Sequence, residues 1–167
     1  MSFTAQCRIN TPLGPLCAAR TELGLAGLWF DAQAHHPGPL DAPWVDDDPL
    51  LLQVAALLTD YFECRLEVQA LARLPLAPRG SPFQQEVWRA LLRIPSGHSR
   101  SYGELAASLG RPHAARAVGA AIGRNPISIL IPCHRVLGAG GGLTGYAGGL
   151  ARKQALLRLE GTAFAEA

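Results

Sequence analysis

The sequence predicts an α+β protein in two parts, a small N-terminal antiparallel sheet with a flanking helix and a mostly helical C-terminal domain with a helix–turn–helix. Three observations predict this fold class. Short apolar segments and turn residues alternate in the first 30 residues, prolines and a glycine interrupt the chain at 73–80, and two helix-start signatures follow between 81 and 104. A chain of 167 residues, 49% hydrophobic and 17% charged, can build such cores, which excludes disorder and coiled coil.

The N-terminal part reads as a meander followed by a helix. We expect strands at residues 6–10, 16–20 and 25–30, the first two joined by the turn Thr11-Pro12-Leu13-Gly14-Pro15. Residues 31–48, rich in Pro, His and Asp, are predicted to be a loop. Asp48 is the predicted cap of a helix with Pro49 at its first position, which continues to Phe62. The predicted domains are residues 1–72 and 81–167, with 73–80 as the linker.

The C-terminal part opens with two capping boxes. Residues 81–84 (Ser-Pro-Phe-Gln) start a helix whose predicted core face is formed by Phe83, Val87, Trp88 and Leu91. Residues 101–104 (Ser-Tyr-Gly-Glu) start a second helix that runs to about Leu109. A turn through 110–113 then leads to a third helix at 114–123, and this spacing is typical of a helix–turn–helix.

The remaining chain combines an apolar run, a short polar motif and a flexible loop. Residues 127–131 are predicted to be a buried strand that leads into the motif Pro-Cys-His-Arg-Val at 132–136. Seven glycines fall within residues 138–149, without the lysine or glycine spacing of a nucleotide-binding loop. A last helix is expected at 150–160, ending at Gly161.

The charge is divided unequally between the two parts. Residues 1–80 contain 5 arginines and 9 acidic residues, a net charge of −4, whereas residues 81–167 contain 10 basic and 4 acidic residues, a net charge of +6. A basic second part favours a polyanionic partner, and chance composition remains the alternative.

The predicted second helix of the helix–turn–helix is unusual for a reader of the major groove. Seven of its ten residues at 114–123 are alanine or glycine, and Arg116 is its only long polar side chain. Such a smooth surface permits close approach to a sugar-phosphate backbone in the minor groove. Tight packing against another helix would use the same residues, so the composition alone leaves both interpretations open.

Cys133 is the candidate nucleophile. It follows a proline and precedes His134, and a thiol needs a base or a cationic neighbour to become a nucleophilic thiolate. Glu160 lies in the last turn of the final helix, where the helix dipole disfavours an acid, so it is a candidate for orienting the histidine. The alternatives are a buried, inert cysteine and a solvated carboxylate.

Together these motifs resemble one family of DNA-repair proteins. Asn125-Pro126, Ile131 to Val136, Ser101-Tyr102 and Ala115 to Gly119, with Thr144 to Gly149 and Leu159-Glu160-Gly161, are similar to the motifs of bacterial O6-alkylguanine-DNA alkyltransferases, the methylated-DNA–protein-cysteine methyltransferases. The resemblance covers residues 81–161, and residues 1–80 match only in general plan. It implies a ribonuclease H-like N-terminal domain.

The resemblance also implies a role for each matched residue. Cys133 would accept the alkyl group, His134 would keep it a thiolate through a water with support from Glu160, and Asn125 would hold the turn before the active-site strand. The resemblance places Tyr102 near the DNA phosphate and purine N3, with Lys153 supporting its hydroxyl. It places a helix in the minor groove, where Arg116 would fill the gap left by the flipped nucleotide beside Ala114, Ala115, Ala117 and Gly119. The guanine pocket would be formed by Pro132, Val136, Tyr146 and Ala147.

The implied reaction moves the alkyl group from O6-alkylguanine, and from O4-alkylthymine, to Cys133 in one irreversible step after nucleotide flipping. The implied partner is double-stranded DNA, bound in the minor groove, and no cofactor is implied. Ala147 departs from members that carry a serine there. The zinc ligands of some members are not matched by the N-terminal cysteines and histidines, so we predict no metal. Cooperative self-association along DNA stays open.

Three other classes of protein would show different features. A related lesion-sensing protein would lack the acceptor cysteine, a transcription regulator would carry several base-reading side chains on its second helix, and a Cys–His hydrolase would turn over. No signal peptide, membrane-spanning run or Cys-x-x-Cys pair is visible, so a cytoplasmic, reduced protein without membrane contact is expected.

Overall fold

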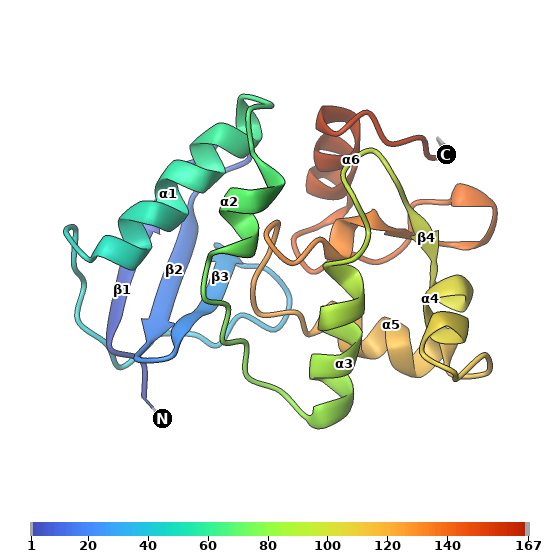
Figure 1. The fold of residues 1–167 in the computed structure, drawn as a ribbon, viewed down its shortest axis with the longest axis horizontal. Coiled ribbons are helices and arrows are strands. Elements are labelled where there is room, and N and C mark those ends of the chain that lie inside the picture. The colour runs from blue at the N-terminus through green and yellow to red at the C-terminus, as the bar shows by residue number, and fades with distance from the viewer. Residues whose placement is uncertain (1, 166–167) are drawn as a thin grey trace. The chain divides into compact units, whose positions relative to one another are not determined.

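The computed structural model describes residues 2–165, and it divides them into two compact units (Figure 1). The first contains the residues up to Arg79 together with Pro126–Leu130, and the second contains residues 80–125 and those from Ile131 onward. The antiparallel sheet and the helices confirm the predicted α+β class.

An antiparallel sheet and one long helix form the core of the first unit. The strands are β1 (Ala5–Ile9), β2 (Leu16–Thr21) and β3 (Gly24–Phe30), in the order β1-β2-β3. Helix α1 (Pro49–Phe62) packs on the sheet (Figure 1), with Leu51, Val54 and Leu58 buried. Asp48 caps it as predicted, because its carboxylate accepts the backbone N–H groups of Leu50 and Leu51.

The segment after the short helix α2 (Val68–Ala72) pairs with β3. Leu25 donates its N–H to Pro75 O at 2.8 Å, and its carbonyl accepts the N–H of Ala77 at 2.7 Å. Gly24 fits this close approach because a Cβ there would lie 2.1 Å from Pro75 O. Much of the segment expected to be a linker is therefore hydrogen-bonded within the first unit.

The predicted strand at 127–131 is wrong. Ile127 makes a single bridge to Leu28, Ser128 donates its N–H to Leu28 O and its hydroxyl to Gln33, and the chain then reverses. Ile129 has a φ of 70°, a left-handed conformation that a β-branched residue rarely adopts and that no strand permits. The apolar composition of this segment indicates that it is buried, not that its backbone is extended. The buried turn belongs to the first unit.

The second unit is built around three helices. They are α3 (Pro82–Leu91), α4 (Tyr102–Ser108) and α5 (Ala115–Gly123), and both predicted capping boxes form, at Ser81 and at Ser101. Helices α4 and α5 form the predicted helix–turn–helix, and the Trp88 indole N–H links α3 to α5 by donating to Ala121 O at 2.9 Å. Phe83, expected in the core, is only half-buried, and Arg111 lies over its ring.

Short elements complete this unit. Strands β4 (Arg100–Ser101) and β5 (Val136–Leu137), which the sequence did not indicate, form a parallel pair. They are accompanied by the 3₁₀ turns η1 (Cys133–Arg135) and η2 (Ala139–Gly141) and by helix α6 (Leu150–Leu159), capped by Glu160. Across residues 2–165 no helix has the length and apolar character to cross a membrane.

Gly24 offers a test of the pairing between β3 and Pro75. We expect Gly24→Ala to lower the free energy of unfolding by about 3 kcal/mol, because φ is +141° and the new Cβ would clash with a backbone carbonyl. Gly38→Ala is the matched control, since Gly38 also has a positive φ, +79°, but has open space where a Cβ would lie, and it should lose only about 1 kcal/mol. Equal losses in urea unfolding would contradict the close approach.

Candidate active site

Asn125 is the last residue before the chain leaves the second unit, and its side chain bonds to the residue at which the chain returns. Its side-chain N–H donates to Ile131 O at 2.9 Å and to Cys133 Sγ at 3.1 Å. Asn125 is 3% exposed and Cys133 is 5% exposed, so both bonds are shielded from water. One amide therefore fixes the backbone before the cysteine and contacts the sulfur itself.

Cys133 begins a 3₁₀ turn directly after Pro132, and its own N–H donates to Ile131 O. Burial raises the pKa of the Cys133 thiol above its ordinary value. The Asn125 amide, the charge of Lys153 and backbone N–H groups at Cys133 and His134 act in the opposite direction. The resting site thus favours the thiol, and it already holds the groups that stabilise a thiolate once the proton leaves.

His134, Arg135 and Glu160 form a buried cluster beside the cysteine. His134 Nε2 lies 2.8 Å from Glu160 Oε1, and Arg135 donates to both carboxylate oxygens, from Nε at 2.8 Å and from Nη2 at 2.9 Å. The side chains of His134 and Glu160 are 0% and 2% exposed. The arrangement explains how an acid is tolerated at the C-terminal end of α6.

The protonation states in this cluster follow from the same contacts. Burial lowers the pKa of His134, and it outweighs the opposite effect of Glu160. Burial alone would raise the pKa of Glu160, but the hydrogen bonds from His134 and Arg135 and their charges lower it to about 2. At neutral pH the site therefore contains a carboxylate and a neutral imidazole that can accept a proton.

The second imidazole nitrogen is the one available for proton transfer. His134 Nδ1 is buried and has no hydrogen-bond partner among residues 2–165, and no direct bond joins it to the Cys133 sulfur in that range. Transfer of the thiol proton to His134 through a water, which the resemblance implies, stays a prediction.

Lys153 and Tyr102 meet at a single carbonyl. Lys153 is fully buried and its ammonium donates to the carbonyls of Val136, Thr144 and Gly145, while the Tyr102 hydroxyl donates to Thr144 O at 3.1 Å. Burial lowers the pKa of Lys153 to about 8 and raises that of Tyr102. Lys153 and Tyr102 are thus linked through the Thr144 carbonyl, and the support of Tyr102 by Lys153 stays a prediction.

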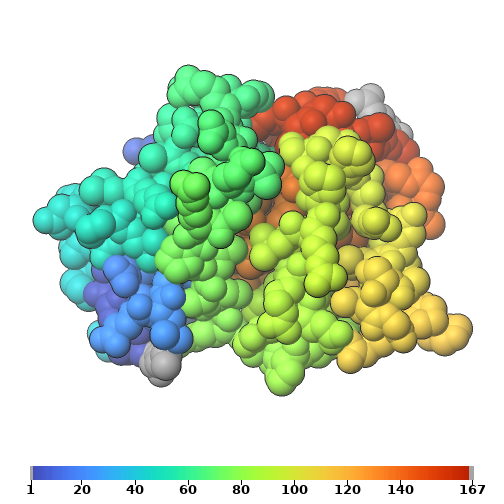
Figure 2. Space-filling view, viewed as in Figure 1, coloured from blue at the N-terminus to red at the C-terminus, as the bar shows by residue number. Residues whose placement is uncertain are grey.

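Helix α5 presents small residues and one long cation, Arg116, to solvent. Arg116 and Ala117 are exposed on α5, and Ala114 and Ala115 are half-buried. A Cβ at Gly119 would lie 3.4 Å from the Tyr102 ring, so the small residue lets this tyrosine pack against α5. In the face drawn in Figure 2 the yellow segment of the chain, which includes α4 and the turn after it, lies at the surface.

The predicted pocket residues flank the cysteine along the chain. Pro132 and Val136 are buried at the two ends of the η1 turn, and the Val136 carbonyl is held by Lys153. Tyr146 and Ala147 are half-buried in the loop before α6, and the Tyr146 carbonyl accepts the N–H of Gly149.

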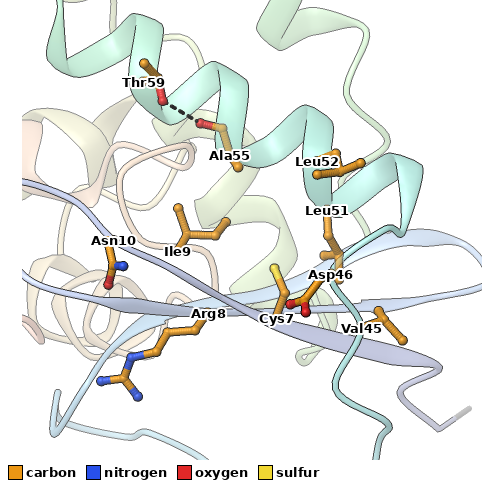
Figure 3. A pocket seen from close by; sticks show the side chains of 10 residues that line it. All are labelled: Cys7, Arg8, Ile9, Asn10, Val45, Asp46, Leu51, Leu52, Ala55 and Thr59. Carbon is orange, nitrogen blue, oxygen red and sulfur yellow. Dashed lines mark hydrogen bonds between the residues drawn. The ribbon is translucent and has the colours of Figure 1, made fainter.

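The cysteines of the first unit lie in a different electrostatic environment. Cys7 lines a pocket of about 290 Å³ between β1, the 45–46 segment and α1 (Figure 3). Burial, followed by the charges of Cys17, Asp46 and Asp48, raises its pKa to about 11. Burial also raises the pKa of Cys17. Cys17 Sγ donates to Gln6 Oε1 at 3.8 Å, which favours the thiol, whereas Cys133 Sγ accepts a bond from the Asn125 amide, which favours a thiolate.

Sequence reasoning did not find every contributor to the site. Arg135 was present in the matched motif but was given no role, and only its two bonds to Glu160 reveal one. The Thr144 carbonyl has no sequence signal, because any residue offers one. Among residues 2–165 no three His, Cys, Asp or Glu side chains gather as a metal-binding group.

Fold and site together define a class: an α+β protein in which a helix–turn–helix unit also holds a buried cysteine beside a histidine–carboxylate pair. Comparisons with known proteins make the class specific. Residues 82–162 match the family model described as 6-O-methylguanine DNA methyltransferase, DNA binding domain. The methylated-DNA–protein-cysteine methyltransferase of Methanosarcina barkeri is 46% identical over 91% of this chain and 94% of its own.

Solved structures agree with these sequence matches. The crystal structure of Mycobacterium tuberculosis OGT in complex with DNA has a TM-score of 0.81 and 43% identity, covering 95% of this chain and 93% of that one. The O6-methylguanine-DNA methyltransferase from Pyrococcus kodakaraensis, at 22% identity and a TM-score of 0.70 over 95% of this chain and 99% of its own, shares the fold. The chain belongs to the methylated-DNA–protein-cysteine methyltransferase family, which confirms the resemblance and makes it an enzyme of direct-reversal DNA repair.

The lowered pKa of Glu160 predicts a contribution to acid stability. With a folded pKa of about 2 against an ordinary 4.5, the carboxylate stabilises the fold above pH 4.5, and this is lost as the pH falls toward 2, up to about 3 kcal/mol. Wild type should therefore lose its stability advantage over Glu160→Gln between pH 5 and pH 2 in urea unfolding.

Glu86→Gln is the control for this titration. It removes an exposed carboxylate paired with Arg111, a contact worth less than about 1 kcal/mol. A difference between wild type and Glu160→Gln that does not change with pH would show that Glu160 is not held ionised.

Proposed function

We propose that this chain repairs O6-alkylguanine, and O4-alkylthymine, by transferring the alkyl group from duplex DNA to Cys133, once per molecule. The observation that carries the proposal is the contact of the Asn125 amide with Cys133 Sγ, beside the buried Lys153. These groups stabilise negative charge on sulfur, and a buried cysteine with no chemical task would not need them.

The reaction is a displacement at the alkyl carbon. The Cys133 sulfur forms a bond to that carbon as the bond from carbon to O6 breaks, and the electron pair leaves with the guanine. The thiol proton passes to the surroundings through His134, and guanine takes up one proton, so the net products are a thioether and an unmodified base. A thioether offers no easy leaving group, so the acceptor is consumed.

His134 and Glu160 support the proton transfer in this proposal. The neutral imidazole accepts the thiol proton through a bridging water at Nδ1, and the Glu160 carboxylate at Nε2 stabilises the imidazolium that results. Without such a base the buried thiol would remain protonated, because burial raises its pKa.

DNA would be bound through the minor groove by α5. Its alanines and glycines allow close approach to the sugar-phosphate backbone, and Arg116 is the one long side chain that could fill the gap left by a flipped nucleotide. Flipping costs a few kcal/mol and is needed because the alkyl carbon is inaccessible inside a duplex. The net charge of +6 over residues 81–167 supports phosphate binding.

The flipped base would enter between the turn at Cys133 and the loop before α6. Tyr102 would crowd the phosphate and bond purine N3, with Lys153 holding the shared Thr144 carbonyl. Pro132, Val136 and Tyr146 would line the pocket, and the backbone N–H of Ala147 would serve where other members have a serine.

Intact mass tests the transfer. After mixing with a duplex that contains O6-methylguanine, the protein should gain one methyl group, about 14 Da, and stop at one equivalent. Cys133→Ser should gain nothing, whereas Cys64→Ser, which removes the exposed cysteine of the first unit, should react as wild type does. Tight lesion binding without a mass gain would instead indicate a lesion-sensing protein.

Arg116 tests the mode of DNA binding. We expect Arg116→Ala to lower the single-turnover transfer rate at saturating DNA by at least about tenfold, because flipping loses its supporting side chain. Arg89→Ala removes the same charge from an exposed position on α3 and should weaken binding in a salt-dependent manner while leaving transfer within the complex unchanged. Equal effects of the two variants on transfer would reduce Arg116 to a general phosphate contact.

A further inference from the structure

We propose that Arg135 is the positioning residue of the proton-transfer group: it holds Glu160 in one orientation and so keeps His134 aligned as the proton acceptor. The inference rests on the proposed function of Cys133 and His134. Arg135 itself would not touch the substrate, and it would act through the carboxylate.

Arg135 fixes the orientation of the Glu160 carboxylate through hydrogen bonds to both of its oxygens. Arg135 binds the carboxylate with a fork of two N–H groups, and one of the two oxygens it holds, Oε1, is the oxygen that contacts His134 Nε2. A third guanidinium nitrogen, Nη1, donates to Ile94 O just after α3. The guanidinium is therefore fixed from two sides, and the shared oxygen transmits its position to the imidazole.

The buried negative charge of Glu160 requires a cationic partner, and Arg135 provides it. A carboxylate that is 2% exposed at the C-terminal end of a helix would be strongly destabilised with a neutral imidazole as its only partner. Arg135, 13% exposed, neutralises it before any proton moves. Glu160 can then remain ionised and stationary while His134 changes its protonation state, which is what a positioning carboxylate must do.

Arg135 also tunes the imidazole. The charges that act on His134 are Glu160, which favours its protonation, and Arg135 and Lys153, which oppose it. Cys133 precedes it, α3 also packs on this turn, and the Ile94 carbonyl, just after α3, accepts a bond from Arg135. Removing the Arg135 charge leaves Glu160 less compensated, so the imidazole should hold its proton up to a higher pH.

Two variants separate charge from geometry. Arg135→Gln removes the charge, and Arg135→Lys keeps the charge but cannot form the fork. Arg65→Gln is the matched control, because it breaks another arginine–carboxylate pair, with Asp60 at 3.3 Å, in the first unit and outside this cluster. For each protein, the His134 ring signals are titrated by NMR without DNA, and single-turnover transfer from an O6-methylguanine duplex is measured across pH.

For R135Q we expect the His134 titration and the low-pH limb of the transfer profile to move together to higher pH, with the plateau rate lowered about a hundredfold. For R135K we expect a wild-type His134 titration with a rate about tenfold lower, since position is lost but charge is kept. R65Q should match wild type in both measurements. The number of methyl groups accepted per folded molecule should stay at one throughout.

Several outcomes would overturn the proposal. In R135Q, an unchanged His134 titration with an unchanged rate would do so, as would fewer active molecules at a normal rate and pH profile, which is the result of a merely structural role. If R135Q does not fold, R135K decides, because a wild-type rate there excludes positioning by the fork. Absence of transfer in wild type would refute the function of Cys133, while the NMR titration would still decide whether Arg135 governs His134.

Discussion

The structure of the site depends on the bond that Asn125 makes across the turn at Pro126–Leu130. The chain crosses from one compact unit to the other and back within five residues, and its return is marked by the unfavourable backbone of Ile129. Such a conformation persists only where the surroundings determine it. The Asn125 amide, bonded to Ile131 O, fixes the end of this excursion, and its contact with Cys133 makes the placement of the sulfur a consequence of the same constraint.

Two buried charges of the second unit, on Lys153 and Glu160, are satisfied by groups of the chain itself. The Lys153 ammonium donates hydrogen bonds to three backbone carbonyls, and the Glu160 carboxylate accepts hydrogen bonds from the Arg135 guanidinium and the His134 imidazole. Buried ion pairs contribute little net stability, because the loss of hydration offsets their attraction. In the proposed transfer, these groups would supply fixed charge where the charge on the sulfur and the imidazole changes, so no solvent would have to reorganise.

Local signals in the sequence predicted the elements well. Both capping boxes, the Asp48 cap and the helix–turn–helix spacing depend on contacts within a few residues, and all of them form. The buried turn at 127–131 could not be predicted, because apolar side chains indicate burial but not the direction of the backbone, and a positive φ at an isoleucine has no compositional signature. The motif located Cys133, His134 and Glu160, yet the part of Arg135 emerged only from long-range geometry, 25 residues apart in the chain.

Single use explains why such a buried nucleophile is acceptable. A turnover enzyme has to release its product and regenerate its thiol, which favours an open site and a labile bond to sulfur. A stoichiometric acceptor has neither requirement, because it reacts once. Burial of the sulfur therefore slows no later step of product release or thiol regeneration. Burial also raises the pKa of the Cys133 thiol, and a protonated thiol reacts more slowly with electrophiles than a thiolate does. The protonated resting state and the surrounding donors therefore serve one end: the sulfur is guarded before the substrate arrives and stabilised as a thiolate when it reacts.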